Sequence, residues 1–187
     1  MEWLDGRRTM AISDRIVALY ERCYSRPPWS ETSQQLADYA GKLAEAATRP
    51  GFTALTVTGA DTDEDSDAGR RRLLGVCYGW PTRDVRDGER VHSAVISAFG
   101  ADRAAELIGG AFAVAELFVD PDAQRQGIGR RLMRTMVDEH ETAWLVTHTH
   151  APAARLYRSL GWEEQGLLPA DFYRRLRLSL FTLGNSR

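Results

Sequence analysis

The feature that most constrains the fold of this 187-residue chain is an apolar run from Ala111 to Val119 that leads through a short loop into a helix. An almost unbroken apolar run is typical of a central strand covered on both faces. The sequence Asp120-Pro121-Asp122 ends this run. Apolar residues at helical spacing then follow between about Gly127 and His140, namely Ile128, Leu132, Met133, Met136 and Val137. The sequence therefore predicts a buried strand, a tight loop and a helix in direct succession.

The rest of the chain shows further helical and strand patterns. They predict, in chain order, a helix from Ser13 that ends at Pro27-Pro28, a helix carrying Leu36 to Ala47, a hairpin of strands 52–58 and 73–80, an interrupted helical region at 91–107, a strand at 143–147, a helix at 152–160, and strands from Trp162 and over 172–181. The charged block at 61–72 is expected to form a solvated hairpin tip. This order of elements predicts a mixed α/β domain.

The composition of the chain excludes several other classes of protein. Apolar residues make up 43% and charged residues 27%, which is ordinary for one soluble globular domain. A net charge of −2 gives no field that would attract nucleic acid. No stretch approaches the roughly 20 apolar residues that span a membrane. Cys23 and Cys77 are too few for a disulfide framework, so we expect free thiols in a reducing cytoplasm.

The loop between the buried strand and its helix has the chemistry of an anion site. Gly127 and Gly129 allow a ligand to approach the backbone closely, and the first amides of a helix have no partner within it. The helix dipole and Arg125, Arg130 and Arg131 add positive charge, so a pyrophosphate fits. The pattern is neither a nucleotide P-loop nor Gly-x-Gly-x-x-Gly. A glycine-capped helix start with basic surface residues is the alternative interpretation.

The segment from Gln124 to Gly129 resembles motif A of the GCN5-related N-acetyltransferases (GNAT), whose signature is Gln/Arg-x-x-Gly-x-Gly/Ala. Gln124, Gly127 and Gly129 occupy the signature positions. In that family the loop amides hold the pyrophosphate of acetyl-CoA, and the preceding strand binds its pantetheine arm. The resemblance thus implies cofactor contacts at Leu117, Phe118, Val119, Gln124, Arg125, Gln126, Gly127, Ile128, Gly129 and Arg130.

A second segment, from His150 to Trp162, resembles motif B of the same family, commonly Asn-x-x-Ala-x-x-Leu-Tyr-x-x-x-Gly-Phe. His150 stands in the position of the family's Asn, where it is the expected cofactor contact, and Trp162 replaces Phe. The resemblance implies a single GNAT-like domain over residues 1–187, with a central mixed, mostly antiparallel sheet flanked by helices. It also implies an acceptor-side half at 1–110 and an acetyl-CoA-binding half at 111–187.

Two residues are candidates for proton transfer during acetylation of an amine. Tyr157 lies at the motif B position whose tyrosine often protonates the leaving thiolate in the family, and a phenol with a pKa of about 10 suits that task. Glu116 is a carboxylate in an apolar strand, where burial raises its pKa toward the range of a useful base. The alternatives are core packing for Tyr157 and a structural ion pair for Glu116.

Other polar and aromatic residues are weaker candidates. His148 and His150 form a His-x-His pair without a third ligand, so we expect no metal; one of them is an alternative base or polar contact. Aromatic rings beside a carboxylate suit a cationic amine, which makes Trp29, Glu31, Tyr78 and Trp80 candidates for the acceptor site, with ordinary core packing as the alternative.

Three functions remain open at the level of sequence. The first is an acetyl-CoA-dependent N-acetyltransferase that acts on a small primary amine by direct attack in a ternary complex. The second is an N-acetyltransferase whose acceptor is a protein N-terminus or lysine. The third is a regulatory module that binds acyl-CoA without turnover. No nucleic-acid or membrane partner is expected, and pairing of sheet edges makes a homodimer one expected assembly.

Overall fold

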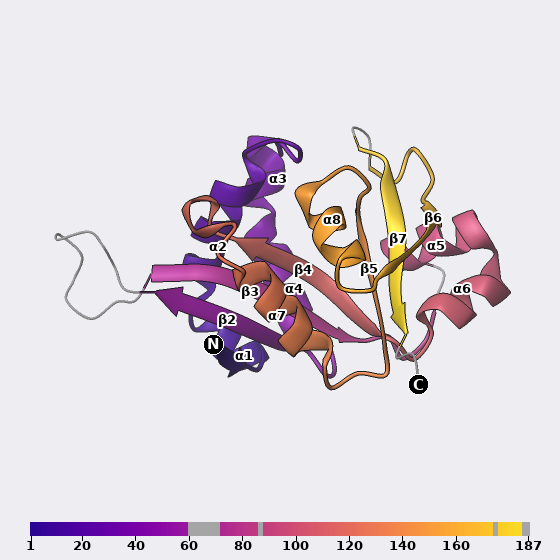
Figure 1. The fold of residues 1–187 in the computed structure, drawn as a ribbon, viewed down its shortest axis with the longest axis horizontal. Coiled ribbons are helices and arrows are strands. Elements are labelled where there is room, and N and C mark those ends of the chain that lie inside the picture. Colours follow the sequence, from indigo (N-terminus) through magenta and orange to yellow (C-terminus); the bar gives the residue numbers. More distant parts are fainter. Residues whose placement is uncertain (60–71, 86–87, 174–175, 185–187) are drawn as a thin grey trace. The chain divides into compact units, whose positions relative to one another are not determined.

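The strands of the protein form a seven-stranded sheet in the order β1-β2-β3-β4-β5-β7-β6 (Figure 1). The computed structural model describes residues 1–59, 72–85, 88–173 and 176–184. β4 pairs with β5 in parallel, whereas β1–β2, β2–β3, β5–β7 and β6–β7 are antiparallel pairs. The strands are β1 (Glu2–Leu4), β2 (Thr53–Gly59), β3 (Arg72–Pro81), β4 (Phe112–Val119), β5 (Thr142–His148), β6 (Glu163–Leu167) and β7 (Leu178–Gly184). This mixed sheet flanked by helices confirms the predicted α/β fold class.

The helices of the described residues agree with most of the predicted ones. They are α1 (Gly6–Met10), α2 (Ser13–Tyr24), α3 (Ser33–Ala37), α4 (Tyr39–Ala47), α5 (Arg90–Phe99), α6 (Ala101–Ile108), α7 (Ile128–Val137) and α8 (Pro152–Arg158), with a 3-10 turn η1 at Pro121–Ala123. The predicted interruption at Gly100 separates α5 from α6. The predicted apolar stripe of α7 is confirmed in full, because all five of its residues are buried.

The chain forms two compact units, and each unit is assembled from two separate segments. The first unit contains Met1–Gly79 and Glu116–Met136, and the second contains Trp80–Ala115 and Val137–Arg187. The chain therefore passes between the units within β3 and again within β4. Each unit thus combines residues from both halves of the sequence. The expected division into an acceptor-side half (1–110) and an acetyl-CoA-binding half (111–187) concerns function and stays a prediction.

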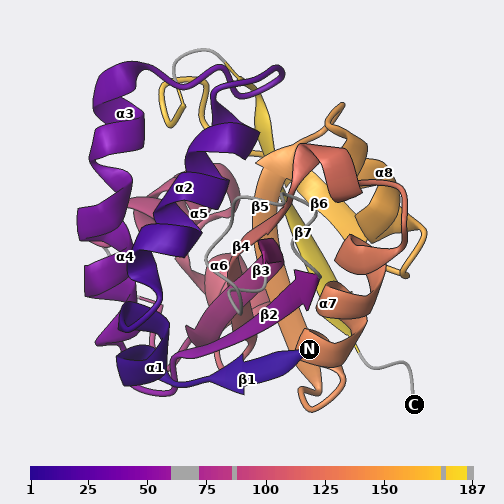
Figure 2. The ribbon, with the colours of Figure 1, turned by 90° about the vertical axis from the view of Figure 1, so that its left-hand side faces the viewer.

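In the first unit, short helices pack against an antiparallel ribbon of strands. α1 contacts β1, β2 and α4, and α2 contacts α3 and α4, as Figure 2 shows at its left. The amphipathic α2 buries Ile16, Leu19, Tyr20 and Tyr24, so the periodicity predicted for this helix is confirmed. Burial of this stripe positions two tyrosine side chains inside the unit.

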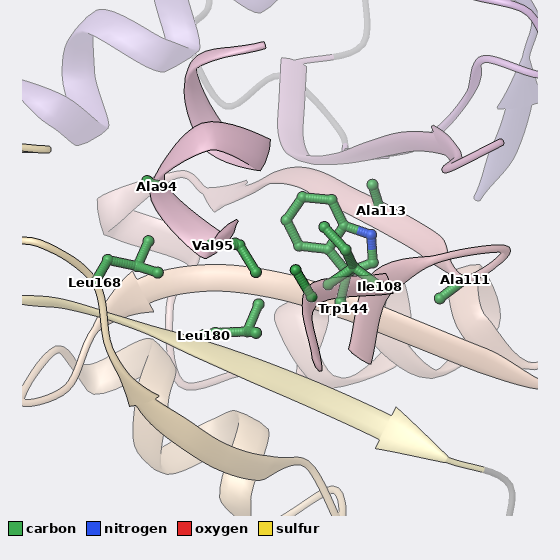
Figure 3. Packing of buried hydrophobic residues seen from close by; sticks show 9 residues of the cluster. Ala94, Val95, Ile108, Ala111, Ala113, Trp144, Leu168 and Leu180 are labelled. Carbon is green, nitrogen blue, oxygen red and sulfur yellow. The ribbon is translucent and has the colours of Figure 1, made fainter. Parts of the chain in front are cut away.

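The second unit has its own apolar core, built around Trp144 of β5 (Figure 3). Val95 of α5, Ile108 of α6 and Leu180 of β7 belong to this core and are fully buried. The indole Nε1 of Trp144 donates a hydrogen bond of 2.7 Å to the hydroxyl oxygen of Thr82, which is also buried. A buried polar group is stable only when it is paired, so this bond orients the largest side chain of the core.

Several elements differ between the prediction and the structure. The helix expected over Leu36 to Ala47 is divided at Asp38 into α3 and α4, and α3 already begins at Ser33. The strand expected over 172–181 begins only at Leu178, and Phe172 lies instead in a turn that its amide closes onto the carbonyl of Pro169. β1 and α1 were not predicted. Of the charged block at 61–72, residues 61–71 lie outside the described residues.

The bond between Trp144 and Thr82 gives a test of the second unit's core. Thr82→Val keeps the side-chain shape but leaves the buried indole N–H without its acceptor, which should lower the free energy of unfolding by about 1–3 kcal/mol. Urea unfolding measures the change. Thr142→Val, at an exposed position on the same strand as Trp144, is the matched control and should change stability by less than about 0.5 kcal/mol. Equal effects of the two substitutions would contradict the assigned bond.

Candidate functional site

The loop that joins β4 to α7 exposes its backbone where the helix begins. Residues 124–127 are exposed, and Arg125 and Gly127 have φ angles of 64° and 78°. The first helical hydrogen bond runs from the amide of Arg131 to the carbonyl of Gly127, so the amides of Ile128 and Gly129 precede the hydrogen-bonded ladder of the helix. A Cβ at position 127 would meet no atom within 4 Å, so space does not require glycine there. The left-handed backbone conformation does, because other residues adopt it only with strain. The geometry is that of an anion-binding helix start.

The start of α7 is held in place by close packing against β3. A Cβ on Gly75 would lie 2.9 Å from Leu132 and 3.1 Å from Ile128, so only glycine lets the helix approach this strand so closely. Ile128 and Leu132 are buried in this contact. The buried stripe of the helix thus fixes the position from which its first amides are presented.

The side chain of Gln124 braces the end of β4. Its Nε2 donates to the carbonyl of Val119 at 3.2 Å, and the thiol of Cys23 donates to the same carbonyl at 3.3 Å. A carbonyl oxygen has two lone pairs, so both are in use here. The predicted pantetheine contact at Val119 would therefore not come from this carbonyl.

Glu116 lies on β4 with a hydrogen-bonded but partly exposed carboxylate. The hydroxyl of Tyr24 donates to its Oε2 at 2.5 Å. Burial raises the pKa of Glu116 to about 7, the hydrogen bond from Tyr24 and the charge of Lys42 lower the pKa, and Glu31 raises it. The pKa of about 7 places the ionisation of this group near neutral pH, which fits a general base.

A stack of tyrosines surrounds this carboxylate. Tyr20 lies between Tyr24 and Tyr39, with ring centroids 4.0 Å and 3.5 Å apart and nearly parallel planes. The ring of Phe118 meets all three rings edge-on at 5.7–6.2 Å. Phe118 is buried in this packing, so its predicted contact with a cofactor would have to come from its backbone.

Three of the four residues expected in the acceptor site lie in the same unit as Glu116. Glu31 accepts a hydrogen bond of 2.9 Å from Tyr20, and the Trp29 ring lies 5.4 Å from that of Tyr24. Tyr78 is buried, with its hydroxyl 3.3 Å from that of Tyr39. Trp80 instead packs against the core of the second unit.

Tyr157 and the two histidines belong to the second unit. Tyr157 is buried on α8, with its ring 5.9 Å from Trp162 and 6.4 Å from Phe181. His150 is exposed after β5, and its ring lies 5.7 Å from that of His148. Nδ1 of His148 is buried and has no hydrogen-bond partner in the described structure.

Sequence reasoning missed Tyr20, Tyr24 and Tyr39 as site residues, because it assigned them only to apolar stripes. Their only signal in the sequence was a polar hydroxyl at positions of a helix that were expected to be buried. Among the described residues, no three His, Cys, Asp or Glu side chains gather as metal ligands would. No helix in that part of the chain has both the length and the apolar character to cross a membrane.

A sequence model of the acetyltransferase (GNAT) domain matches residues 84–164. This range contains β4, the exposed loop, α7, β5 and α8, which are the elements that carry both motifs. Residues 84–164 therefore match the GNAT acetyltransferase domain, as the two motifs predicted. The sequence predicted an acyltransferase, which is the class of enzyme that this domain model describes.

Relatives and solved structures agree with the family. The ribosomal protein bS18-alanine N-acetyltransferase of Escherichia coli K12 is 50% identical over 52 residues, which are 25% of this chain and 35% of that enzyme. The chain thus spans about a third of the length of the curated relatives that it matches. Arabidopsis thaliana NAA60 bound to acetyl-CoA has a TM-score of 0.59 at 14% identity over 95% of both chains. Drosophila melanogaster polyamine N-acetyltransferase has a TM-score of 0.59 at 15% identity over 97% of both chains. The two structures show the fold.

The raised pKa of Glu116 has a measurable consequence for stability. A glutamate in an unfolded chain has a pKa of about 4.3. Between that value and the pKa of about 7 in the folded protein, the folded state binds more protons, so stability from this group falls as the pH rises. Glu116→Gln keeps an acceptor for Tyr24 but cannot ionise. The variant should therefore gain stability relative to the parent between about pH 5 and about pH 8 in urea unfolding.

The control for this comparison is Glu163→Gln, which replaces an exposed carboxylate on β6. This substitution should change the free energy of unfolding by the same amount at about pH 5 and about pH 8. If the free energies of unfolding of Glu116→Gln and the parent differed by the same amount at about pH 5 and about pH 8, burial would not raise the pKa of this carboxylate.

Proposed function

We propose that the protein transfers an acetyl group from acetyl-CoA to the primary amine of a small molecule, by direct attack in a ternary complex. The observation that carries this proposal is Glu116, whose pKa is about 7 and which lies on the strand that leads into the exposed loop. A base that is half-ionised near neutral pH is what an amine acetyltransferase needs and what a binding module does not. The match to the GNAT domain supports the same reaction.

The exposed loop is the proposed site of the acetyl-CoA diphosphate. The amides of residues 125–130 and the side chains of Arg125 and Arg130 would bind its negative charge. The pantetheine arm would follow the backbone at Leu117 and Val119, and His150 would contact the cofactor in place of the family's Asn. The acetyl-CoA bound to the Arabidopsis relative supports this choice of cofactor.

In the proposed reaction, Glu116 removes a proton from the ammonium group of the acceptor, directly or through a water molecule. The step is required because an alkylammonium has a pKa of about 10.4. The free amine attacks the thioester carbonyl, and a backbone amide of β4 stabilises the oxyanion. Collapse of the tetrahedral intermediate breaks the C–S bond, and Tyr157 donates its proton to the leaving thiolate. The nitrogen releases its remaining extra proton, and the tyrosinate is protonated again. The products are the acetylated amine and CoA.

The acceptor is proposed to be small and cationic because aromatic rings and carboxylates gather around Glu116. Trp29, Glu31 and the tyrosine stack are the packed aromatic and acidic surroundings that bind a cationic amine. The polyamine acetyltransferase among the structural neighbours acts on such amines. A protein alanine is the alternative acceptor, because the E. coli relative acts on ribosomal protein bS18.

A panel of acceptors tests the function and separates these alternatives. The protein is incubated with acetyl-CoA and either small mono- and diamines or peptides with a free N-terminal alanine, and thiol release and product mass are measured. We expect CoA release and an acetylated product with small amines. Turnover on the peptides alone would establish the protein acceptor. Heat of association with CoA without turnover on any amine would establish a binding module.

Tyr157→Phe removes the proposed acid and keeps the packing of its ring. We expect kcat to fall at least about tenfold with little change in acetyl-CoA affinity, because a proton-transfer group acts only in the transition state. Steady-state kinetics and calorimetry with CoA provide the two measurements. Tyr173→Phe, in the loop before β7, is the matched control and should keep its kcat. An unchanged kcat in Tyr157→Phe would remove this residue from the mechanism.

A further inference from the structure

Asp120, directly before the 3-10 turn η1, is a fully buried carboxylate that pairs with two arginines. Asp120 follows β4 and has no solvent-exposed side-chain surface. Arg22 of α2 donates to both of its oxygens, at 2.9 Å and 3.0 Å. Arg72 of β3 donates from Nε and Nη2 to Oδ2, at 3.0 Å and 2.7 Å. The amide of Asp122 supplies a fifth hydrogen bond at 3.0 Å.

Asp122 extends this group into an ionic clasp of two carboxylates and two arginines. Its exposed side chain accepts from Arg22 at 2.7 Å and from Arg72 at 3.1 Å. The hydrogen bond from Arg72 and the charges of both arginines lower the pKa of Asp122. The two positive and two negative charges balance, so the clasp adds no net charge beside the place proposed for a diphosphate.

The clasp is tied directly to the backbone that leads into the loop. The amide of Asp120 donates to the carbonyl of Leu74 on β3 at 2.8 Å, and its carbonyl accepts from Ala123 at 2.8 Å. Gln124 closes the segment by donating to Val119. Hydrogen bonds therefore hold the segment from residue 119 to residue 124. The exposed residues 124–127 follow directly after this segment.

Stability alone does not account for this arrangement. A buried ion pair loses most of its Coulombic gain to desolvation, and apolar residues of similar volume often stabilise a protein as well or better. What arginine adds is direction, because its planar fork holds a carboxylate in one orientation. In the clasp, two such forks reach the same carboxylate from different elements of the first unit.

We propose that Arg22, Asp120 and Arg72 are positioning residues, which orient the amides of residues 125–130 for the diphosphate of acetyl-CoA. This inference rests on the proposed function. The residues of the clasp act through the backbone and do not touch the reacting atoms. Their contribution therefore applies only to a donor that carries a diphosphate, and not to the thioester or to the amine.

Two acetyl donors separate positioning from a general structural role. Acetyl-CoA and acetyl-pantetheine share the thioester and the pantetheine arm, but only acetyl-CoA has the diphosphate. In Asp120→Asn, which keeps the shape and removes the charge, kcat/KM for acetyl-CoA should fall at least about tenfold, which corresponds to the loss of one directed contact. With acetyl-pantetheine, kcat/KM should stay within about twofold of the parent. The KM for the amine should not change.

Conservative variants keep the test decisive if Asp120→Asn fails to fold. Arg22 is partly exposed, so Arg22→Gln and Arg22→Lys disturb the core less. Arg22→Gln should show the same selective loss with acetyl-CoA, and Arg22→Lys should restore part of it because it keeps the charge without the fork. Glu106→Gln, which breaks the exposed ion pair with Arg103 on α6, is the matched control and should leave both donors unaffected.

The outcomes distinguish this inference from the proposed function. Equal losses with both donors, or no loss with either in a folded Arg22→Gln variant, would overturn the positioning role while the parent enzyme still acetylates amines. A parent protein that neither binds CoA nor acetylates any amine would overturn the proposed function instead. A selective loss with acetyl-CoA, partly restored in Arg22→Lys, would establish the role of the clasp.

Discussion

The architecture of the candidate site depends on compensating one negative charge at the end of β4. A carboxylate without exposed surface, such as Asp120, is tolerated only when its charge and lone pairs are matched. Arg22 and Arg72 supply that match, so the end of β4 is bound to both α2 and β3. The packing of α7 against β3 holds the other end of the loop, and the exposed residues lie between these two attachments.

β4 combines buried apolar residues with an ionisable carboxylate. Four of its eight residues are apolar and buried, which gives the sheet a stable centre. Glu116 interrupts that pattern, and the burial that raises its pKa to about 7 also makes its ionised form unfavourable. The shifted pKa, which suits the base proposed here, comes at the expense of stability, a trade-off common at functional sites. The hydrogen bond from Tyr24 moderates the shift.

Local patterns predicted the fold well where one element buries one face. The stripe of α7, the strands of the hairpin and the break between α5 and α6 all follow from spacing and glycine positions within a short window. The prediction failed where neighbours in space decide the outcome. Phe172 was expected in the same strand as Leu178, yet β7 begins only at Leu178, because Phe172 lies in a turn closed onto Pro169. The short β1 forms because β2 offers it a partner.

The sequence by itself determined the class of site on this protein: a buried strand, a glycine-containing loop and a helix start, with the residue types of the GNAT motifs in order. These features lie within one continuous stretch, so their spacing is visible without a fold. Only the tertiary structure decided which distant side chains complete the site. Tyr24 and Glu116 are 92 residues apart, and Arg22 and Asp120 are 98 residues apart. Their partnerships depend on how α2 packs against the end of β4, and no local periodicity carries that information, because it arises from the burial of several elements at once.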